Sequence, residues 1–386
     1  MYMNTRKHLR RKQASHFSFS QKICLFILVV TIGIITWATY EMAQSRVSAS
    51  IQVANDSLDL TKDEQVLADQ IDQLLQKNDY VGSVYIRKNN RVILEKGYGY
   101  ANEEAQQPNT PSLYYQIGSI QKAMTALLIL KQVDIGKLSL DTKLDKFYPQ
   151  INGSNKITIK DLLYMRSGLK KTASPTVPMN DQEVIQFALD HLEYTNDQSY
   201  KYEPLNFTLL TGILMKLTHQ PYEKLVYDQI ITPLQLKQTT FYDQVKNTSE
   251  HAVSYQMSPD DDYHQALTES ETDIRNELGT GNISMSVYDL NEFFTKVLKG
   301  KLIPQDLLFS LWGKNLNGRP YNGGVYSGRD TIFAQGNINR FHAVLAMKKD
   351  TSDAVVLESN IQADKKYKTT ATDLRDQIYK LMGNDE

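Results

Sequence analysis

The chain begins with a long apolar run and continues with shorter segments of mixed character. Residues 23–40 (ICLFILVVTIGIITWATY) are almost wholly apolar. A helix of this length rises about 27 Å, close to the roughly 30 Å hydrocarbon core of a bilayer. We therefore expect a transmembrane anchor at 23–40, preceded by a tail at 1–22 and followed by a polar linker at 41–60 and a folded domain at 61–386.

The charge distribution indicates how this anchor is oriented. Residues 1–40 carry six basic side chains and no acidic one, whereas the whole chain has a net charge of −1, which leaves −7 for the remainder. Basic residues beside a membrane span stay in the cytoplasm, so the pattern predicts a single-pass protein whose domain lies outside the cell membrane. A cleaved signal peptide ending near Val47-Ser48-Ala49 is the alternative interpretation. A basic N-terminal segment followed by an acidic remainder does not indicate nucleic-acid binding.

The pattern after residue 60 predicts an α+β domain. Thr61 and Glu64 form a capping box that starts a helix, in which apolar residues recur at helical spacing: Val66, Leu67, Ile71, Leu74 and Leu75. Two strand-like runs, 81–86 and 91–97, flank an Asn89-Asn90 turn.

The other end of the chain repeats this strand and helix character. Runs at 341–347 and 354–358 are typical of strands, and an amphipathic helix follows with Leu374, Ile378 and Leu381 on one face. The middle, about 115–300, is mostly helical in period. We therefore expect one antiparallel sheet built from both chain ends and flanked by helices, with a mostly helical lobe inserted between them.

Composition narrows the chemistry. The 386 residues are 41% hydrophobic and 23% charged, which is typical of a globular protein. Cys24 is the single cysteine, and the seven histidines are scattered without ligand spacing. We therefore expect no disulfide framework, no metal site and no cofactor.

Two S-x-x-K motifs stand out, Ser119–Lys122 and Ser167–Lys170. About two such matches arise by chance in a chain of this length, so the motif alone carries little weight. The first motif opens an apolar helix that ends near Gly136, where i and i+3 share a face and a desolvated lysine can take the serine proton. The second lies in a loop-like stretch (YMRSGLKK), so context favours Ser119 as nucleophile.

The stretch YYQIGSIQKAMTALLILKQVDIGKLSLDTKLDKFYP resembles the nucleophile helix of the class C β-lactamase and low-molecular-weight penicillin-binding protein family of serine hydrolases. Collinear similarity extends over about 80–360, through GSVYIRKNNRVILEKGYGYAN, ITIKDLLYMRSGL, ITPLQLKQTTF and GTGNISMSVYDLNEFF. The resemblance implies a β-lactamase/transpeptidase-like fold. It also implies that Tyr202, in KYEPLNFTLLTG, is the tyrosine of the family's Y-x-N motif, acting beside Lys122 as general acid and base.

Two positions depart from the family pattern. Pro204 replaces the asparagine of Y-x-N, and Asn206 lies two residues further on, where a helix starting at Pro204 would turn it elsewhere. The basic residue of the third motif, K-T-G or H-x-G, is replaced in Ala334-Gln335-Gly336. The backbone N–H groups of Ser119 and Asn337 still provide an oxyanion hole. We therefore expect acylation to be retained and carboxylate recognition to be altered, with Asn206, Gln335, Gly336 and Arg340 as weak substrate-binding candidates and His342 as a further source of charge.

Three functions remain open. The first is an esterase that removes D-alanine from (lipo)teichoic acid, whose ester offers a free amine and no carboxylate on the leaving side, although a body charge of −7 does not favour a polyanionic polymer. The second is a D-alanyl-D-alanine carboxypeptidase or penicillin-binding protein acting on peptidoglycan stem peptides. The third is an inactive family member that binds wall polymer. All three expect a cell-wall polymer as partner, in a Gram-positive-like envelope.

Overall fold

The computed structural model describes Gly33, residues 58–313 and residues 320–384. The chain divides into two units, Met1–Ser57 and Leu58–Glu386, and the second is described below. Apart from Gly33, the expected anchor at 23–40 lies outside the described residues. Within the part of the chain that is described, no helix is both long and apolar enough to cross a membrane.

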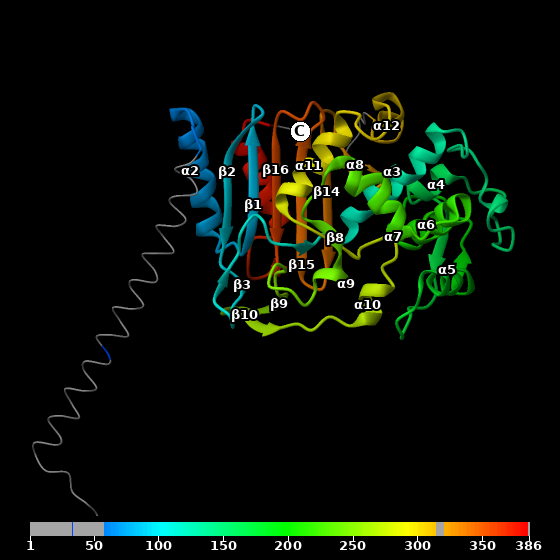
Figure 1. The fold of residues 1–386 in the computed structure, drawn as a ribbon, viewed down its shortest axis with the longest axis horizontal. Coiled ribbons are helices and arrows are strands. Elements are labelled where there is room, and N and C mark those ends of the chain that lie inside the picture. The colour runs from blue at the N-terminus through cyan, green and yellow to red at the C-terminus, as the bar shows by residue number, and fades with distance from the viewer. Residues whose placement is uncertain (1–32, 34–57, 314–319, 385–386) are drawn as a thin grey trace, which may run out of the picture. The chain divides into compact units, whose positions relative to one another are not determined.

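One seven-stranded antiparallel sheet organises the second unit (Figure 1). Both chain ends contribute to it, as expected, because β1 pairs with β16 from the C-terminal part of the chain. The Asn89-Asn90 turn is confirmed, since both residues have positive φ and join adjacent strands. The strand order is β12 (Tyr321–Asn322), β13 (Val325–Ser327), β14 (Thr331–Ile338), β15 (Phe341–Lys348), β16 (Ala354–Ser359), β1 (Gly82–Lys88) and β2 (Arg91–Tyr98).

Each face of the sheet is covered by helices. Val84, Val344 and Leu357 point to a core formed with α2 (Lys62–Lys77) and α13 (Ala371–Leu381), while the alternate residues Leu345 and Val356 point to the larger core. Helix α11 (Val287–Leu298) packs on that second face against β1 and β16. Burial on both faces explains why the central parts of β15 and β16 are runs of apolar residues.

The two terminal helices form where the pattern predicts them, but their buried faces differ in detail. The Thr61 capping box is present, with Glu64 donating its amide to the threonine hydroxyl and its carboxylate accepting from the Thr61 amide. Val66 and Leu381, expected on the packed faces, are 50% and 46% exposed. Tyr379 of α13 and Met382, directly after the helix, are buried instead, because the face against the sheet continues from Ile378 at i+1 and i+4.

The middle of the chain forms the inserted helical lobe, with α3 (Gln121–Asp134) at its centre. Its helices and 3₁₀ or π turns are η1 (Gly118–Ile120), η2 (Leu144–Lys146), α4 (Ile159–Leu163), α5 (Asp181–Asp190), α6 (Leu205–Thr218), α7 (Tyr222–Val226), η3 (Tyr227–Ile231), α8 (Thr232–Leu234), α9 (Tyr242–Val245), α10 (Glu271–Arg275) and α12 (Gln305–Leu311). Short strands accompany them: β3 (Tyr100–Asn102) with β4 (Gln107–Pro108), β5 (Tyr115–Gln116) with β11 (Ile283–Met285) and β8 (Thr239–Phe241), β6 (Leu169–Lys171) with β7 (Leu192–Tyr194), and β9 (Tyr255–Ser258) with β10 (Asp261–Ala266).

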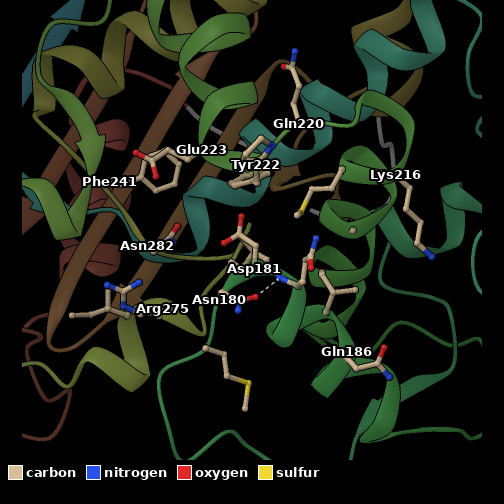
Figure 2. Close-up of a pocket in the computed structure, with 18 of the residues that line it drawn as sticks. Asn180, Asp181, Gln186, Lys216, Gln220, Tyr222, Glu223, Phe241, Arg275 and Asn282 are labelled. Atoms are coloured by element: carbon tan, nitrogen blue, oxygen red, sulfur yellow. Dashed lines mark hydrogen bonds between the residues drawn. The ribbon is translucent and has the colours of Figure 1, made fainter.

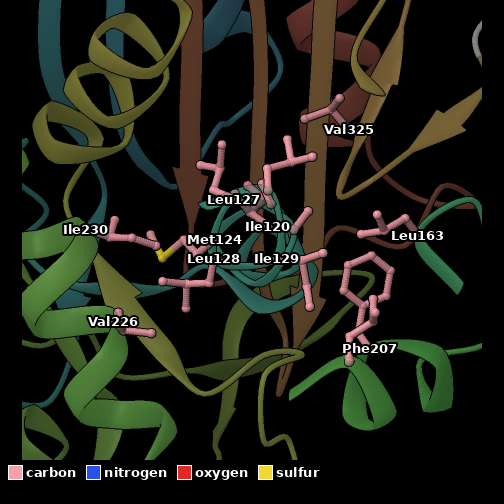
Figure 3. Packing of buried hydrophobic residues seen from close by; sticks show 14 of the residues in the cluster. Ile120, Met124, Leu127, Leu128, Ile129, Leu163, Phe207, Val226, Ile230 and Val325 are labelled. Atoms are coloured by element: carbon pink, nitrogen blue, oxygen red, sulfur yellow. The ribbon is translucent and has the colours of Figure 1, made fainter. Parts of the chain in front are cut away.

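Helix α3 is buried on nearly every side (Figure 3). Met124 and Leu128 lie toward Val226 and Ile230, while Ile129 lies toward Leu163 and Phe207. A helix that is apolar all round is fixed in position by its surroundings. The residues at its N-terminus are therefore held rigidly against the sheet.

Candidate active site

Ser119 lies in the η1 turn that leads directly into α3. Gly118, just before it, has a φ of +48°, which only glycine adopts without strain. The first N–H groups of a helix have no partner within it, and the helix dipole places positive potential there. The turn therefore presents the serine hydroxyl where negative charge on oxygen is stabilised.

Lys122 is the immediate partner of Ser119. Its Nζ lies 2.9 Å from Ser119 Oγ and also donates to the Thr280 carbonyl at 3.0 Å. The side chain is 1% exposed, and burial lowers the pKa of Lys122 to about 8, with the Glu277 carboxylate acting in the opposite direction. Roughly one-tenth of the amine is then neutral at pH 7, enough to accept the serine proton.

Tyr202 stands on the other side of this pair, just before α6. Lys122 Nζ lies 5.5 Å from the centre of its ring. Burial raises the pKa of Tyr202, and its hydrogen bond with Ser119 acts in the opposite direction. The ring packs edge-on against Tyr321 of β12 at 5.5 Å, although 42% of the residue remains exposed. Ser119, Lys122 and Tyr202 therefore come together in one place.

Strand β14 passes directly over the nucleophile turn. A Cβ added to Gly336 would stand 1.9 Å from the Ile117 carbonyl oxygen and 2.7 Å from the Ser119 amide nitrogen, so only glycine permits this approach. A Cβ on Gly118 would stand 3.1 Å from the Asn337 backbone. The amides of Ser119 and Asn337 are therefore close neighbours.

The register of the β14–β15 hairpin sets the direction of the Asn337 amide. Asn339 and Arg340 form its two-residue turn, with φ of 46° and 67°, and Ile338 faces Phe341. The pair that closes such a turn exchanges hydrogen bonds, so the next pair, Asn337 and His342, directs its backbone groups away from the partner strand. The Asn337 N–H is thus free to join that of Ser119 in an oxyanion hole.

The region around Pro204 departs from the family pattern as the sequence predicts. Pro204 is the residue before the first turn of α6 and offers no side-chain cap. Asn206 is 1% exposed, and its Nδ2 donates to the Glu203 carbonyl at 2.8 Å. Its Oδ1 is buried and has no partner among the residues that the structure describes, so Asn206 has no exposed oxygen to offer a substrate.

The third motif has no charge in place of the lost basic residue. Ala334 is fully buried in the larger core, and Gln335 is half-buried on β14. Arg340 is exposed at the tip of the hairpin. The interpretation of His342 as a source of charge is wrong: it is buried, contacts Thr372 of α13 at 3.2 Å, and burial lowers its pKa to about 4.

The sequence does not predict two glutamates that lie near the nucleophile turn. Glu269 accepts hydrogen bonds from the Gln116 and Asn339 amides, the second at 2.6 Å, and thereby ties the strand before Ser119 to the β14–β15 turn. Burial raises the pKa of Glu269 to about 7, against the effect of these hydrogen bonds. Glu277 lies in the loop that carries Thr280. Neither glutamate belongs to a motif, and only the fold brings them to Ser119.

A separate cavity of about 1080 Å³ lies among α5, α6 and α7. Figure 2 shows Asp181 near its centre, with Tyr222 and Asn282 around it. Ser119, Lys122 and Tyr202 are not among its lining residues. Among the described residues, no group of three or more His, Cys, Asp or Glu side chains is placed to hold a metal ion.

Comparisons with known proteins place this site in context. A family model described as Beta-lactamase matches residues 67–380. The chain is 28% identical over 330 residues to Protein flp of Staphylococcus aureus (strain MW2), which covers 79% of this chain and 65% of that protein. It is 23% identical over 398 residues to the Putative penicillin-binding protein PbpX of Bacillus subtilis, with 99% of both covered.

A third relative and two solved structures complete the comparison. The chain is 30% identical over 234 residues to the Teichoic acid D-alanine hydrolase of Staphylococcus aureus, covering 60% of this chain and 58% of that protein. The crystal structure of FmtA from Staphylococcus aureus has a TM-score of 0.72 at 22% identity, covering 87% and 95% of the two chains. The D-amino acid amidase from Ochrobactrum anthropi SV3 has a TM-score of 0.71 at 18% identity, covering 84% and 99%. The chain thus spans less than two thirds of the length of Protein flp and of the teichoic acid hydrolase.

Proposed function

Because the chain belongs to the beta-lactamase family, whose members are serine hydrolases, we propose that it releases D-alanine from teichoic acid through an acyl-enzyme on Ser119. The observation that carries this proposal is the buried Lys122 amine 2.9 Å from Ser119 Oγ. A desolvated amine at this distance is the activating base that a serine nucleophile requires. The similarity to a Teichoic acid D-alanine hydrolase supports the choice of substrate.

The reaction proceeds in two displacements. Ser119 Oγ attacks the ester carbonyl carbon while its proton moves to Lys122 Nζ, and the carbonyl oxygen becomes an oxyanion between the Ser119 and Asn337 amides. The ester C–O bond then breaks, and the polymer alcohol leaves with the proton held by Lys122, passed directly or through Tyr202. Water attacks the D-alanyl ester of Ser119 and gives a proton to Lys122, which returns it to Ser119 Oγ as the acyl–oxygen bond breaks and D-alanine leaves.

The altered third motif supports an ester without a carboxylate on its leaving side. Ala334 occupies the place of the basic residue that holds a substrate carboxylate in peptidases of this family. Its side chain is buried, and Arg340 is exposed at the tip of the β14–β15 hairpin. A polymer alcohol as leaving group needs no such contact.

D-Alanine release by the purified full-length chain tests the proposal. Lipoteichoic acid and a D-alanyl-D-alanine pentapeptide are offered to the wild type and to Ser119→Ala. Release from lipoteichoic acid by the wild type alone supports the esterase. Release from the peptide alone would leave a carboxypeptidase, and release from neither, without labelling by a fluorescent penicillin, would leave the inactive binding protein.

The carboxypeptidase is the second candidate because of one comparison. PbpX, described as a putative penicillin-binding protein, aligns over 99% of both chains. The same three side chains would acylate a peptide, since the oxyanion hole is made of backbone amides. Against this candidate, Ala334 stands where peptidases of the family have the basic residue that holds the terminal carboxylate.

We propose further that the catalytic unit lies outside the cell membrane, anchored by residues 23–40. The apolar run and the six basic residues in 1–40 support this topology. Protease added to intact cells should remove the catalytic unit while leaving a cytoplasmic marker whole. Protection of the unit in intact cells would refute the proposed orientation.

A further inference from the structure

Glu277 is a half-buried carboxylate beside the nucleophile that the two displacements leave unused. It lies two residues beyond α10, and its Oε2 accepts a hydrogen bond from the Thr280 hydroxyl. The carbonyl of the same Thr280 accepts from Lys122 Nζ at 3.0 Å. Glu277 is therefore held in place by the residue that also positions the catalytic lysine.

The position of Gly281 shows how close this carboxylate is to Ser119. A Cβ on Gly281 would stand 3.1 Å from Glu277 Oε2 and 3.6 Å from the Gly118 carbonyl carbon. That carbon is bonded to the Ser119 amide nitrogen, one of the two oxyanion donors. The carboxylate therefore lies within about two contact distances of the Ser119 amide, which is one of the groups that would bind a substrate carbonyl.

The charges in the site leave Glu277 without a fixed counter-ion. The ion pairs among the described residues do not include Glu277. Its charge acts instead on Lys122, whose pKa it raises against the larger effect of burial. Burial lowers the pKa of Lys122, and as a general base the lysine must be neutral. With Lys122 neutral, the negative charge of Glu277, joined by that of Glu269 as the pH rises through about 7, has no cation to balance it, and a cationic group on the substrate would do so.

The acyl groups that this family transfers differ in charge next to the reacting carbonyl. A D-alanyl ester has a free α-amine, largely protonated at pH 7, two bonds from its carbonyl carbon. In a stem peptide the corresponding nitrogen is a neutral amide. We propose that Glu277 binds the α-ammonium group of the acyl unit, so that Ser119 selects esters of amino acids with a free amine over N-acylated ones.

This inference rests on the acyl-enzyme chemistry of the proposed function, and a matched substrate pair tests it. The full-length wild type, Glu277→Gln and Glu271→Gln are assayed with D-alanine ethyl ester and N-acetyl-D-alanine ethyl ester. Glu271 is a suitable control because it is an exposed carboxylate of α10, 3.6 Å from Lys246, and its substitution changes the net charge equally. The readout is the ratio of kcat/KM for the two esters.

We expect Glu277→Gln to lower the preference for the free amine about 10- to 100-fold, the range of a hydrogen bond to a charged group. Any effect of the substitution on the basicity of Lys122 acts on both esters and cancels in the ratio. Glu271→Gln should keep the wild-type ratio. An unchanged ratio in Glu277→Gln would overturn the inference while leaving the esterase intact.

A second readout does not depend on turnover. A neutral fluorophosphonate labels Ser119, and D-alaninamide should slow the labelling of the wild type more than N-acetyl-D-alaninamide does. In Glu277→Gln the two amides should protect equally, and labelling itself reports that the variant is folded. Equal protection of the wild type by both amides refutes ammonium binding. Failure of the wild type to hydrolyse either ester counts against the proposed function instead.

Discussion

The chain contains the same four-residue motif twice, with opposite outcomes. Lys122 is 1% exposed and its Nζ is 2.9 Å from Ser119 Oγ. The side chain of Lys170 is 65% exposed and pairs with Glu193 at 3.2 Å from strand β6, and Ser167 Oγ accepts the Leu169 amide at 3.1 Å. The spacing makes a catalytic pair only on a helix, where i and i+3 share a face, and burial then makes the lysine a base.

Removing either member of the first motif is the strongest test of this difference. Ser119→Ala and Lys122→Ala should each lower kcat by about 10⁴-fold or more, and to a similar level, because the two act as a unit. D-Alanine release under saturating substrate measures it. Lys170→Ala should stay within about 2-fold of wild type, since an exposed ion pair contributes little. A comparable loss in Lys170→Ala would show that the second motif also participates.

Tyr202→Phe examines whether the first motif needs a third member that the second motif lacks. We expect kcat to fall about 10²- to 10⁴-fold, the usual contribution of a positioned acid–base group. The ring still packs against Tyr321, so the thermal midpoint should hardly change. A kcat within a few-fold of wild type would leave Lys122 as the sole proton carrier.

Gly336→Ala changes strand β14, which lies over the Ser119 turn. The added methyl would stand 1.9 Å from the Ile117 carbonyl oxygen and 2.7 Å from the Ser119 amide, so β14 must move away. We expect kcat to fall about 10²-fold, as for the loss of one oxyanion donor, together with a lower thermal midpoint. Gly136→Ala is the control: its Cβ would meet nothing within 4 Å, so it carries only the strain of positive φ.

The pH dependence of kcat/KM tests whether the buried Lys122 acts as the base. With a pKa of about 8 for Lys122, kcat/KM for the neutral ester N-acetyl-D-alanine ethyl ester should rise about tenfold per pH unit up to pH 8. The residual activity of Lys122→Ala should lack this rise. A wild-type profile that is flat between pH 6 and 8 would contradict the role of Lys122 as base.

The free energy of unfolding should also depend on pH, above pH 8, because the pKa of Lys122 is lowered in the folded state. The pKa of Lys122 is lowered from 10.5 in the unfolded chain to about 8 in the fold. Between these values the unfolded state binds more protons, so this residue makes the free energy of unfolding rise with pH from 8 to 10.5, and below pH 8 its penalty is fully present. Denaturant unfolding of wild type and Lys122→Met at pH 7.5 and 9.5 measures the difference, and equal slopes with pH would refute it.

Local patterns predict the elements near both chain ends well. The capping box at Thr61, the Asn89-Asn90 turn and four of the seven strands of the sheet, β1, β2, β15 and β16, all follow from nearest-neighbour rules. The N-terminal position of Ser119 on an apolar helix likewise follows from periodicity. Spacing alone places Val66 and Leu381 on the packed faces, where the structure leaves both exposed, because spacing does not define how far a packed face extends around a helix.

Long-range contacts explain what the sequence could not reveal. Glu269 reaches Gln116 and Glu277 reaches the surroundings of Gly118 only through folding, and no spacing rule connects either glutamate to position 119. The burial of Asn206 and His342 has the same origin, since each side chain turns inward on an element whose polar residues look accessible in sequence. Side-chain direction at such positions depends on the partner element, which a single sequence does not identify.

The close passage of β14 over Ser119 has a consequence for biosynthesis. A chain that emerges N-terminus first presents Ser119 and Lys122 before the rest of the helical lobe has been made, whereas Gly336 and Asn337 arrive only after it. Long-range strand pairing of this kind is slow and forms late. On the proposed mechanism, the nascent chain therefore cannot form the oxyanion hole until β14 has been made and has paired. Docking of β14 over Ser119 thus acts as the activation step.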